Sequence, residues 1–249
     1  MSRPHSGDHY SYTVYADPAT ARSFDQRRFG GPIGRMVAAS QANAIERFAG
    51  PVQDRTILDV GTGTGRAALL MARLGARVTA VDPSTEMLAI ARTQAAEESL
   101  AIRFAVGDAH QLEFPDRAFD VVVSLRVLMH AADWKRCLTE LCRVSDGLVI
   151  VDYPSSHSVA LFQAIGRRVT HRFGARTEPY RVFGDRAVAA VLRKAGFRVC
   201  AEHRQFVLPI ALHKAVGSRR FSEMTRDWSA RLGLLRLFGS PVTIVAERW

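Results

Sequence analysis

A strand, a glycine-rich turn and a helix follow one another within residues 56–74, and this succession most constrains how the chain can fold. The apolar, β-branched run Thr56–Val60 predicts a buried strand, which stops at the glycine-rich turn Gly61–Gly65. Strongly helix-forming sequence follows at once, from Arg66 to Leu74. Glycines tolerate positive φ angles and let a ligand lie against bare backbone, while a helix N-terminus offers unpaired N–H groups. The segment therefore predicts a ligand-binding turn between a strand and a helix.

The residues of this turn discriminate among three kinds of ligand. A dinucleotide-binding turn has the pattern Gly-x-Gly-x-x-Gly, but Arg66 stands where the third glycine belongs. A Walker A phosphate-binding loop needs a lysine, and none lies near the turn. Gly61, Gly63 and Gly65 alternate instead, and Asp59 lies two residues before the first of them. A carboxylate there repels a pyrophosphate and attracts an ammonium or a sulfonium group.

Two further carboxylates follow the next predicted strands. Asp82 ends the strand that begins with the run Arg77–Val81, and an acid about twenty residues after such a turn can bind ribose hydroxyls. Asp108 follows the run Ile102–Val106, and its carboxylate can accept a hydrogen bond from an adenine amino group. The order Asp-x-Gly-x-Gly-x-Gly, then Val-Asp, then Gly-Asp-Ala resembles the class I S-adenosylmethionine-dependent methyltransferases.

The resemblance extends along the chain, closely over about residues 20–155 and loosely beyond them. Phe24–Gly31 resembles the family's entry segment, which lies near the cofactor, and Phe119–Ser124 resembles its fourth strand. Two motifs are similar to the region that follows this strand in small-molecule members, notably the ubiquinone and menaquinone methyltransferase group: His130-x-x-Asp133-Trp134 and Leu138-x-Glu140-Leu141-x-Arg143-Val144.

The resemblance implies S-adenosyl-L-methionine as the cofactor and indicates which residues bind it. Asp59 and the glycines would hold the methionine moiety, Asp82 the ribose, and Asp108 the adenine side. The complete set of expected cofactor-binding residues is Asp59, Gly61, Thr62, Gly63, Gly65, Asp82, Pro83, Met87, Gly107, Asp108, Ala109 and Ser124. No metal site is predicted, because no other cluster of acids or histidines has the spacing of metal ligands.

From Thr56 onward, predicted strands alternate with predicted helices, which indicates a parallel sheet with helices on both faces. We expect an α/β fold with a Rossmann-like, seven-stranded, mostly parallel sheet. The last three strands lie at Gly147–Tyr153, from Phe197 onward, and at Val242–Ala246. In the family the last strand is antiparallel, and the resemblance implies the same arrangement here.

The 249 residues suffice for one well-buried domain with helical cap elements. We expect residues 1–54 to form an N-terminal arm and helical cap, including a helix from Met36 to Phe48, and residues 55–249 to form the methyltransferase domain. Insertions at about 155–183 and 209–240 are expected to cover the acceptor site. The second insertion carries a group of large or basic side chains: Arg219, Arg220, Trp228 and Arg231.

The three cysteines, Cys137, Cys142 and Cys200, are odd in number and lack Cys-x-x-Cys spacing. This pattern is typical of a reduced protein without a disulfide framework, and Cys137 and Cys142 are expected to pack in or beside the core. The N-terminus has no apolar signal-peptide core, and no stretch is long and apolar enough to span a bilayer. A cytoplasmic location is therefore expected.

The chemistry of the expected cofactor narrows the catalytic residues. Its sulfonium makes the methyl carbon electrophilic, so the enzyme mainly aligns the acceptor, which can contribute about 7–11 kcal/mol. A hydroxyl acceptor also needs a base, and histidine suits that task near neutral pH. His130, which follows the fourth strand, is the leading candidate for the catalytic base, although a purely hydrogen-bonding role is an equal alternative. His157 and Tyr153 are weaker candidates.

The resemblance to the ubiquinone and menaquinone methyltransferase group implies a small, aromatic or lipophilic acceptor that is methylated on oxygen or carbon, and two absent motifs argue against nucleobase acceptors. Methyltransferases that act on the exocyclic amines of nucleobases carry a Pro-Pro-aromatic motif after the fourth strand. This chain has Ser124–Val127 there instead. Cytosine-C5 enzymes use a Pro-Cys nucleophile, and none of the three cysteines follows a proline. Two alternatives stay open: an RNA or other nucleic-acid methyltransferase, and a protein that binds S-adenosylmethionine without transferring its methyl group.

The positive charge of the chain is uneven. Residues 151–249 carry 17 basic and 7 acidic side chains, whereas the first 150 residues carry 17 of each. Apolar residues recur three or four apart from Val159 to Phe173, with arginines between them. This pattern fits either a surface helix over the sheet or a basic amphipathic lid. In the second case residues 158–176 would contact an anionic membrane surface peripherally.

Overall fold

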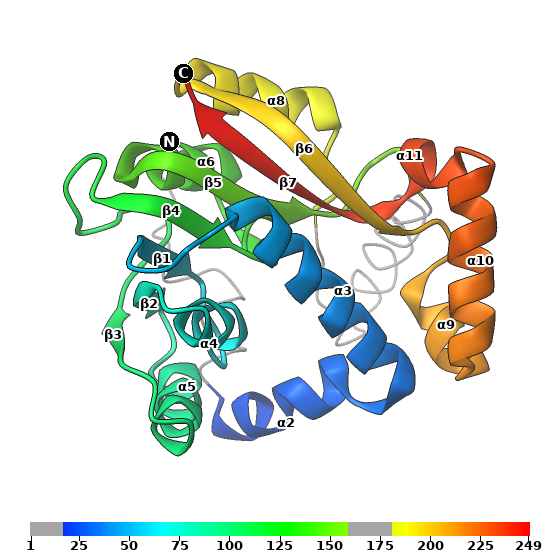
Figure 1. Cartoon of the computed structure of the whole chain (residues 1–249), viewed down its shortest axis with the longest axis horizontal. Helices are drawn as coiled ribbons and strands as arrows, with labels where there is room; N and C mark the ends of the chain where they lie inside the picture. The colour runs from blue at the N-terminus through cyan, green and yellow to red at the C-terminus, as the bar shows by residue number, and fades with distance from the viewer. Residues whose placement is uncertain (1–16, 159–180) are drawn as a thin grey trace, which may run out of the picture.

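A computed structural model describes residues 17–158 and 181–249, which build one seven-stranded sheet with helices on both faces (Figure 1). The strand order is β3-β2-β1-β4-β5-β7-β6. The strands are β1 (Thr56–Val60), β2 (Arg77–Asp82), β3 (Ile102–Val106), β4 (Phe119–Ser124), β5 (Ser145–Tyr153), β6 (Phe197–Phe206) and β7 (Ser240–Arg248).

Strands β1 to β5 pair in parallel, while β7 runs antiparallel between β5 and β6. The predicted fold class and the antiparallel last strand are therefore confirmed. The helices are α2 (Pro18–Phe29), α3 (Gly31–Ala49), α4 (Arg66–Arg73), α5 (Thr85–Glu97), α6 (Trp134–Val144), α8 (Asp185–Lys194), α9 (Ile210–Val216), α10 (Arg219–Arg231) and α11 (Leu234–Phe238), with a short 3-10 helix, η2 (Leu128–His130).

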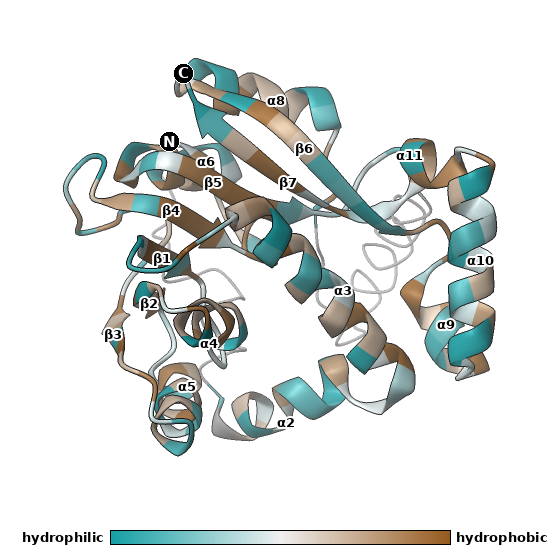
Figure 2. Cartoon of the chain, viewed as in Figure 1, coloured by the Kyte–Doolittle hydropathy of each residue, from teal (hydrophilic) through white to brown (hydrophobic). Residues whose placement is uncertain are grey.

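Two hydrophobic clusters fix the sheet between its helices. Successive strand residues point to opposite faces, so Leu58 packs in the cluster that contains α6 and α8, while Ile57 packs in the cluster that contains α3 and α4. Figure 2 shows β4 and β5 as mostly hydrophobic, as strands covered on both faces must be. Cys137 and Cys142 are buried in the first cluster, as expected, and Cys200 is exposed.

Several element ends differ from the predicted ones. Helix α3 begins five residues before Met36, at Gly31, because Pro32 occupies its first turn, where a missing N–H costs nothing. Strand β6 continues to Phe206 through a polar stretch that includes Glu202 and Arg204. An apolar run could not reveal that stretch, because this edge strand pairs only with β7. The predicted helix at Val159–Phe173 lies outside the described residues. Within the described ranges, no helix combines the length and the apolar composition that crossing a bilayer requires.

The helices outside the β-α alternation lie in front of the sheet and along two sides of the molecule (Figure 1). In Figure 1, α2 runs along the lower edge, α3 crosses diagonally in front, and α9, α10 and α11 form a lobe at the right. Helix α3 contacts both α9 and α10, which joins the lobe to the body. This arrangement surrounds the carboxyl ends of the central strands with helices from both termini of the chain.

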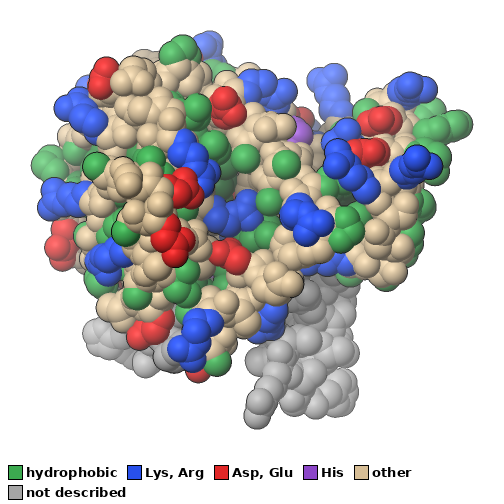
Figure 3. Space-filling view, turned by 60° about the horizontal axis from the view of Figure 1, so that its bottom comes forward, with side chains coloured by type: hydrophobic (Ala, Val, Ile, Leu, Met, Phe, Trp, Pro, Cys, Tyr) green, Lys and Arg blue, Asp and Glu red, His purple; other side chains and the backbone are tan. Residues whose placement is uncertain are grey.

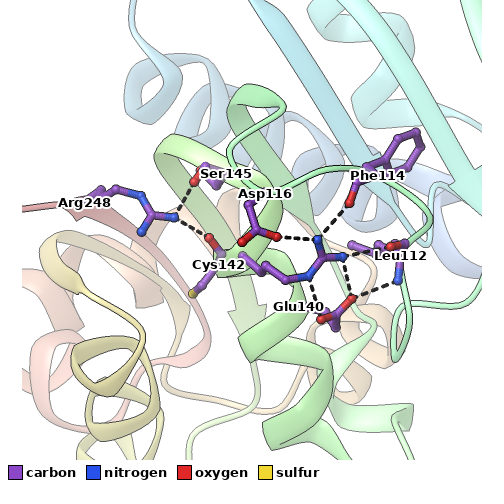
Figure 4. A network of polar contacts seen from close by, with 8 residues as sticks. Leu112, Phe114, Asp116, Glu140, Cys142, Ser145 and Arg248 are labelled. Carbon is purple, nitrogen blue, oxygen red and sulfur yellow. Dashed lines mark hydrogen bonds and ion pairs between the residues drawn. The ribbon is translucent and has the colours of Figure 1, made fainter.

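A polar network holds the segment between β3 and β4 against α6 (Figure 4). The Arg143 guanidinium donates to the carbonyls of Leu112 and Phe114, and it pairs with Asp116 and Glu140, all at 2.8–2.9 Å. Glu140 in turn accepts from the Leu112 N–H at 3.0 Å. The Glu140 and Arg143 positions of the helix motif therefore fix the course of the segment that begins with Asp108.

Candidate active site

The three glycines of the turn serve different purposes. All have positive φ angles, 70° at Gly61, 56° at Gly63 and 90° at Gly65. A Cβ at Gly61 would lie 2.2 Å from a methyl group of Val127, and one at Gly65 would lie 3.0 Å from Ala91 on α5. A Cβ at Gly63 would meet nothing within 4 Å. Gly63 therefore presents bare backbone to open space, whereas the other two glycines allow close packing.

Two buried carboxylates hold the turn from beneath. Asp59 accepts from the Thr62 hydroxyl at 2.6 Å and from the Ala68 N–H at 3.1 Å. Asp82 accepts from the N–H groups of Gly63, at 2.8 Å, and Ser84, at 2.9 Å. Burial raises the pKa of Asp59 to about 6, against the opposing effect of the Thr62 hydrogen bond, and it also raises the pKa of Asp82.

A cavity opens above this turn, and we call it the glycine-loop cavity. Most of the expected cofactor-binding residues line it: Asp59, Gly61, Thr62, Gly63, Asp82, Pro83, Met87, Gly107, Asp108 and Ala109. Gly65 and Ser124 do not line it. Gly65 packs against α5, and the Ser124 hydroxyl donates to the Val60 carbonyl at 2.9 Å, which links β4 to β1. The structure thus gathers residues from three strand ends around one space.

Helix α2 forms the outer wall of the glycine-loop cavity through Phe24, Arg28 and Phe29. The Thr64 hydroxyl donates to Asp25 at 3.0 Å, and the Arg66 guanidinium lies 3.5 Å from the centre of the Phe29 ring. The segment that resembles the family's entry segment therefore lies against the glycine turn. These side chains are absent from the expected set because their spacing carries no ligand-binding pattern of its own.

His110 is a wall residue that the sequence analysis missed. Its Nε2 accepts from the Asp133 N–H at 3.2 Å, so the ring proton is on Nδ1, which lies 2.7 Å from the Asp108 carboxylate. The Asp108 carboxylate also accepts from the His110 N–H at 2.8 Å. His110 thus links Asp108 to the start of α6, and this pairing orients the acid that faces the cavity.

A second cavity, of about 300 Å³, adjoins the first, and we call it the Asp152 cavity. The two share four lining residues: Arg28, Phe29, Arg126 and His130. The wall of the Asp152 cavity is mixed: its apolar members include Val37, Met129, Phe206, Leu208, Ile210 and Pro241, and its basic members are Arg28, Arg126 and Lys214. Its volume lies at the lower end of the range of about 300–1,000 Å³ that is typical of small-molecule pockets.

Asp152, at the end of β5, is the buried acid of this second cavity, with 3% of its surface exposed. It accepts from the Gln41 amide at 3.1 Å and from the backbone N–H of Arg126, whose φ of 63° is in the left-handed region. Burial raises the pKa of Asp152 to about 7, although the nearby Arg28 opposes this effect. Such a carboxyl can gain or lose a proton near neutral pH.

The three histidine and tyrosine candidates occupy different places. His130, on η2, lines both cavities at their junction and is 9% exposed. Tyr153 lines the Asp152 cavity, where burial raises the pKa of its hydroxyl, so it holds its proton firmly. His157 lines neither cavity. The sequence analysis missed Asp152 as a site residue. It lies at the carboxyl end of β5, as Asp82 lies at the carboxyl end of β2, and this place at a strand end could have identified it.

Among the described residues, the second insertion reaches the Asp152 cavity through Pro209 and α9 at one end and through Ser240 at the other. Pro209, Ile210, Ala211 and Lys214 line the Asp152 cavity. Arg219 instead lines a separate cavity between α3 and α10, and Trp228 is 63% exposed. None of Arg219, Arg220, Trp228 and Arg231 lines the Asp152 cavity, because α10 packs against α3 outside it.

Comparisons with known proteins agree on one family. Residues 58–151 match the family model described as a methyltransferase domain. The chain is 35% identical over 185 residues to the demethylmenaquinone methyltransferase of Thermus thermophilus, an alignment that covers 66% of this chain and 83% of that enzyme. It is 32% identical to the 2-methyl-6-phytyl-1,4-hydroquinone methyltransferase of Synechocystis sp., over 58% of this chain and 44% of that enzyme.

The fold has solved counterparts as well. The magnesium protoporphyrin IX methyltransferase of Synechocystis, with bound S-adenosylhomocysteine, superimposes with a TM-score of 0.65 at 17% sequence identity. The match covers 95% of this chain and 99% of that chain. At this identity the likeness concerns the fold alone.

Proposed function

This chain belongs to the class I S-adenosylmethionine-dependent methyltransferases, and on that premise we propose how its two cavities divide the reaction between them. The glycine-loop cavity holds S-adenosylmethionine, and the adjoining Asp152 cavity holds a small aromatic, lipophilic acceptor. The observation that carries this proposal is that the two cavities meet at His130 and Arg126, where a methyl group would pass from one to the other.

The lining of the glycine-loop cavity fits this cofactor. Asp59, Asp82 and Asp108 offer oxygens that accept hydrogen bonds and carry negative charge. Ribose hydroxyls, an adenine amino group and a positively charged methionine moiety are the complementary groups. Arg28 and Arg66 line the same cavity and can bind a carboxylate. Three acids would repel a pyrophosphate, which argues against a dinucleotide.

The bound cofactor supplies an electrophilic methyl group, so this chain's own residues mainly orient the acceptor and handle one proton. Phe29 and Arg126 line both cavities, and α2 covers one side of the cofactor cavity. Asp152 and His130 both face the acceptor side. A hydroxyl of the acceptor would donate its proton to one of them as the new bond to carbon forms.

Apolar wall residues beside a buried acid fit a hydroxylated aromatic ring that carries a lipophilic substituent. The basic Arg28, Arg126 and Lys214 of the same wall would stabilise a negative charge on the oxygen of that ring. Phe206, Leu208 and Ile210 would cover the ring or its substituent, while Asp152 would accept the hydroxyl proton. The relatives' names point the same way, because they act on demethylmenaquinone and on a phytyl hydroquinone. We therefore propose a hydroquinone-like acceptor that is methylated on oxygen or on a ring carbon.

A product assay tests this proposal. Purified enzyme with S-adenosylmethionine is offered lipophilic hydroquinones, simple phenols, aliphatic carboxylic acids and total RNA, and S-adenosylhomocysteine formation is measured. We expect turnover with the hydroquinones, at least tenfold faster than with the carboxylic acids. Labelled methyl in RNA would instead favour the nucleic-acid reading. Cofactor binding without turnover of any acceptor would favour a protein that only binds S-adenosylmethionine.

We also propose that the enzyme works in the cytoplasm, at a membrane surface that it contacts peripherally through residues 158–176. Residues 159–176 lie outside the described part of the chain, so the support is the excess of basic side chains in residues 151–249. Each basic residue close to an anionic bilayer adds about 1 kcal/mol of attraction. We expect sedimentation with anionic but not with neutral vesicles at low salt, and a large loss when Arg167 and Arg168 are both changed to Gln. Equal sedimentation with both kinds of vesicle would contradict this part of the proposal.

A further inference from the structure

A third cavity, of about 630 Å³, lies between α3, β6 and α10. None of its lining residues lines the glycine-loop cavity or the Asp152 cavity. Its charged and titratable members are Arg35, Arg47, His203, Arg219, Glu223 and Arg226. We call this cavity the arginine groove. Figure 3 shows Lys and Arg side chains gathered where the lobe at the right of the molecule joins its body.

Positive charge in the arginine groove exceeds negative charge. Glu223, its one lining carboxylate, is occupied by Arg219 at 2.7 Å, one turn away on α10. Arg226 has a longer contact of 3.3 Å with Asp227. Across the groove on α3, Arg35 and Arg47 are both exposed, and within the described residues neither has an ion pair with a carboxylate. Like charges on two facing helices repel, so the groove carries an excess of positive charge that a bound anion could neutralise.

The pKa of His203, which lines the same groove, responds to this excess of positive charge. His203 is half-buried on β6, and its Nε2 lies 3.0 Å from the Ser40 hydroxyl of α3. Burial lowers the pKa of His203, and the charges of Arg47 on α3 and Arg226 on α10 lower it further. Arg47 and Arg226 line the same cavity as His203, so residues of both walls face a common space.

We propose that the arginine groove is an anion-binding site for a phosphate group, carried either by a soluble phosphate ester or by the headgroup of an anionic lipid. Guanidinium groups bind phosphate through pairs of parallel hydrogen bonds, and arginines on two walls can hold one phosphate between them. The Ser40 hydroxyl and the Asn43 amide, which also line the groove, provide neutral donors beside the charged ones. The bound anion would offset the repulsion between α3 and α10.

His203 makes the proposal testable without an activity assay. The ring signal of His203 in the full chain, assigned by its loss in His203→Gln, is followed by NMR while sodium phosphate is added against sodium chloride of equal ionic strength. We expect phosphate, and not chloride, to give a saturable shift and to raise the pKa of His203. In the double variant Arg47→Gln/Arg226→Gln, phosphate binding should be at least tenfold weaker.

A charge-matched control separates the groove from the overall charge of the protein. The double variant Arg103→Gln/Arg193→Gln removes the same charge from exposed sites on β3 and α8. It should bind phosphate as the unchanged protein does. Both double variants should keep methyl transfer unchanged, so a failure of the groove proposal is distinguishable from a failure of the proposed function. Equal weakening in the two variants, or a chloride response equal to the phosphate response, would overturn the proposal.

Vesicles distinguish the two sources of the phosphate group. The vesicle test uses the Arg167→Gln/Arg168→Gln variant, which removes the membrane contact proposed for residues 158–176. If the source is a lipid headgroup, phosphatidylglycerol vesicles should still bind this variant, phosphate should compete with them, and adding Arg47→Gln/Arg226→Gln should abolish the binding. If the source is soluble, phosphate should shift the His203 signal of this variant while phosphatidylglycerol vesicles bind it no better than phosphatidylcholine vesicles do. The absence of both responses would overturn the proposal.

Discussion

At the scale of single residues, the carboxyl groups of Asp82 and Asp152 differ in their hydrogen-bond partners and in their surroundings. Asp82 accepts two backbone N–H groups and holds the glycine turn, whereas Asp152 accepts an amide and one N–H beside a cavity with both apolar and basic lining residues. Burial raises the pKa of both. The two N–H donors suit Asp82 to holding the turn, and a pKa of about 7 suits Asp152 to gaining or losing a proton near neutral pH.

The change Asp82→Ala tests the expected role of Asp82 in cofactor binding. It removes the expected acceptor for the ribose hydroxyls and also leaves the Gly63 N–H without its partner. Because an unmet hydrogen bond to a charged group costs about 1.5–3 kcal/mol, S-adenosylhomocysteine should bind at least tenfold more weakly by calorimetry. Glu86→Ala on the exposed start of α5 serves as the control. Equal affinities in the two variants would contradict the assignment of Asp82.

The change Asp152→Asn tests the proposed role of Asp152 in proton transfer through the pH profile of methyl transfer to a phenolic acceptor. Asp152 with a pKa of about 7 accepts a proton only once it is ionised, so kcat/KM should rise with pH through about 7 and then level off. In Asp152→Asn this rise should disappear and the plateau should fall at least a hundredfold. If the rise persists in Asp152→Asn and disappears in His130→Gln, then His130 is the base.

The same substitution has a consequence for stability whose sign follows from linkage. An Asp that ionises near pH 4 when unfolded and near pH 7 when folded keeps its proton only in the folded state between these values. Its contribution to the free energy of unfolding therefore falls as the pH rises from about 4 to about 7. The free energy of unfolding in urea, compared between Asp152→Asn and the unchanged protein, should therefore shift in favour of Asp152→Asn from pH 5 to pH 8. A gain at pH 5 that is lost at pH 8 would contradict the raised pKa.

At the scale of elements, α6 supports the walls of the site from outside, because none of its residues lines the glycine-loop cavity or the Asp152 cavity. Its residue Arg143 makes five hydrogen bonds at 2.8–2.9 Å to the segment before β4 and to Glu140. The start of α6 holds His110, which in turn pairs with Asp108. Disturbing one end of this arrangement should thus loosen the adenine side of the cofactor site.

The change Arg143→Lys keeps the charge and removes the planar fork that makes these hydrogen bonds. We expect the free energy of unfolding to fall by about 1–3 kcal/mol and cofactor affinity to fall by less than tenfold. Arg136→Lys, on the same helix and with one contact of 3.4 Å to Gln111, is the matched control. If the chemical denaturation curves of Arg143→Lys and the control coincide, the network does not contribute to the free energy of unfolding.

At the scale of the whole molecule, the sequence predicted the sheet and most of the turn and strand-end residues that line the glycine-loop cavity. Apolar runs that stop at Gly61, Asp82 and Asp108 are local patterns, and parallel pairing brings their ends to one edge. The Asp152 cavity and the arginine groove could not be predicted in this way. They depend on α3 meeting β5, β6 and α10, as in the contact between Ser40 and His203, 163 residues apart.

The measurement that tests the central claim most directly is a crystal structure with S-adenosylhomocysteine and a lipophilic hydroquinone. We predict that the ribose hydroxyls lie within hydrogen-bond distance of Asp82. The sulfur should face the junction of the two cavities at His130, and a hydroxyl or ring carbon of the hydroquinone should face it from the side of Asp152. The account would be contradicted if the hydroquinone bound outside the Asp152 cavity, or if the sulfur pointed away from that junction.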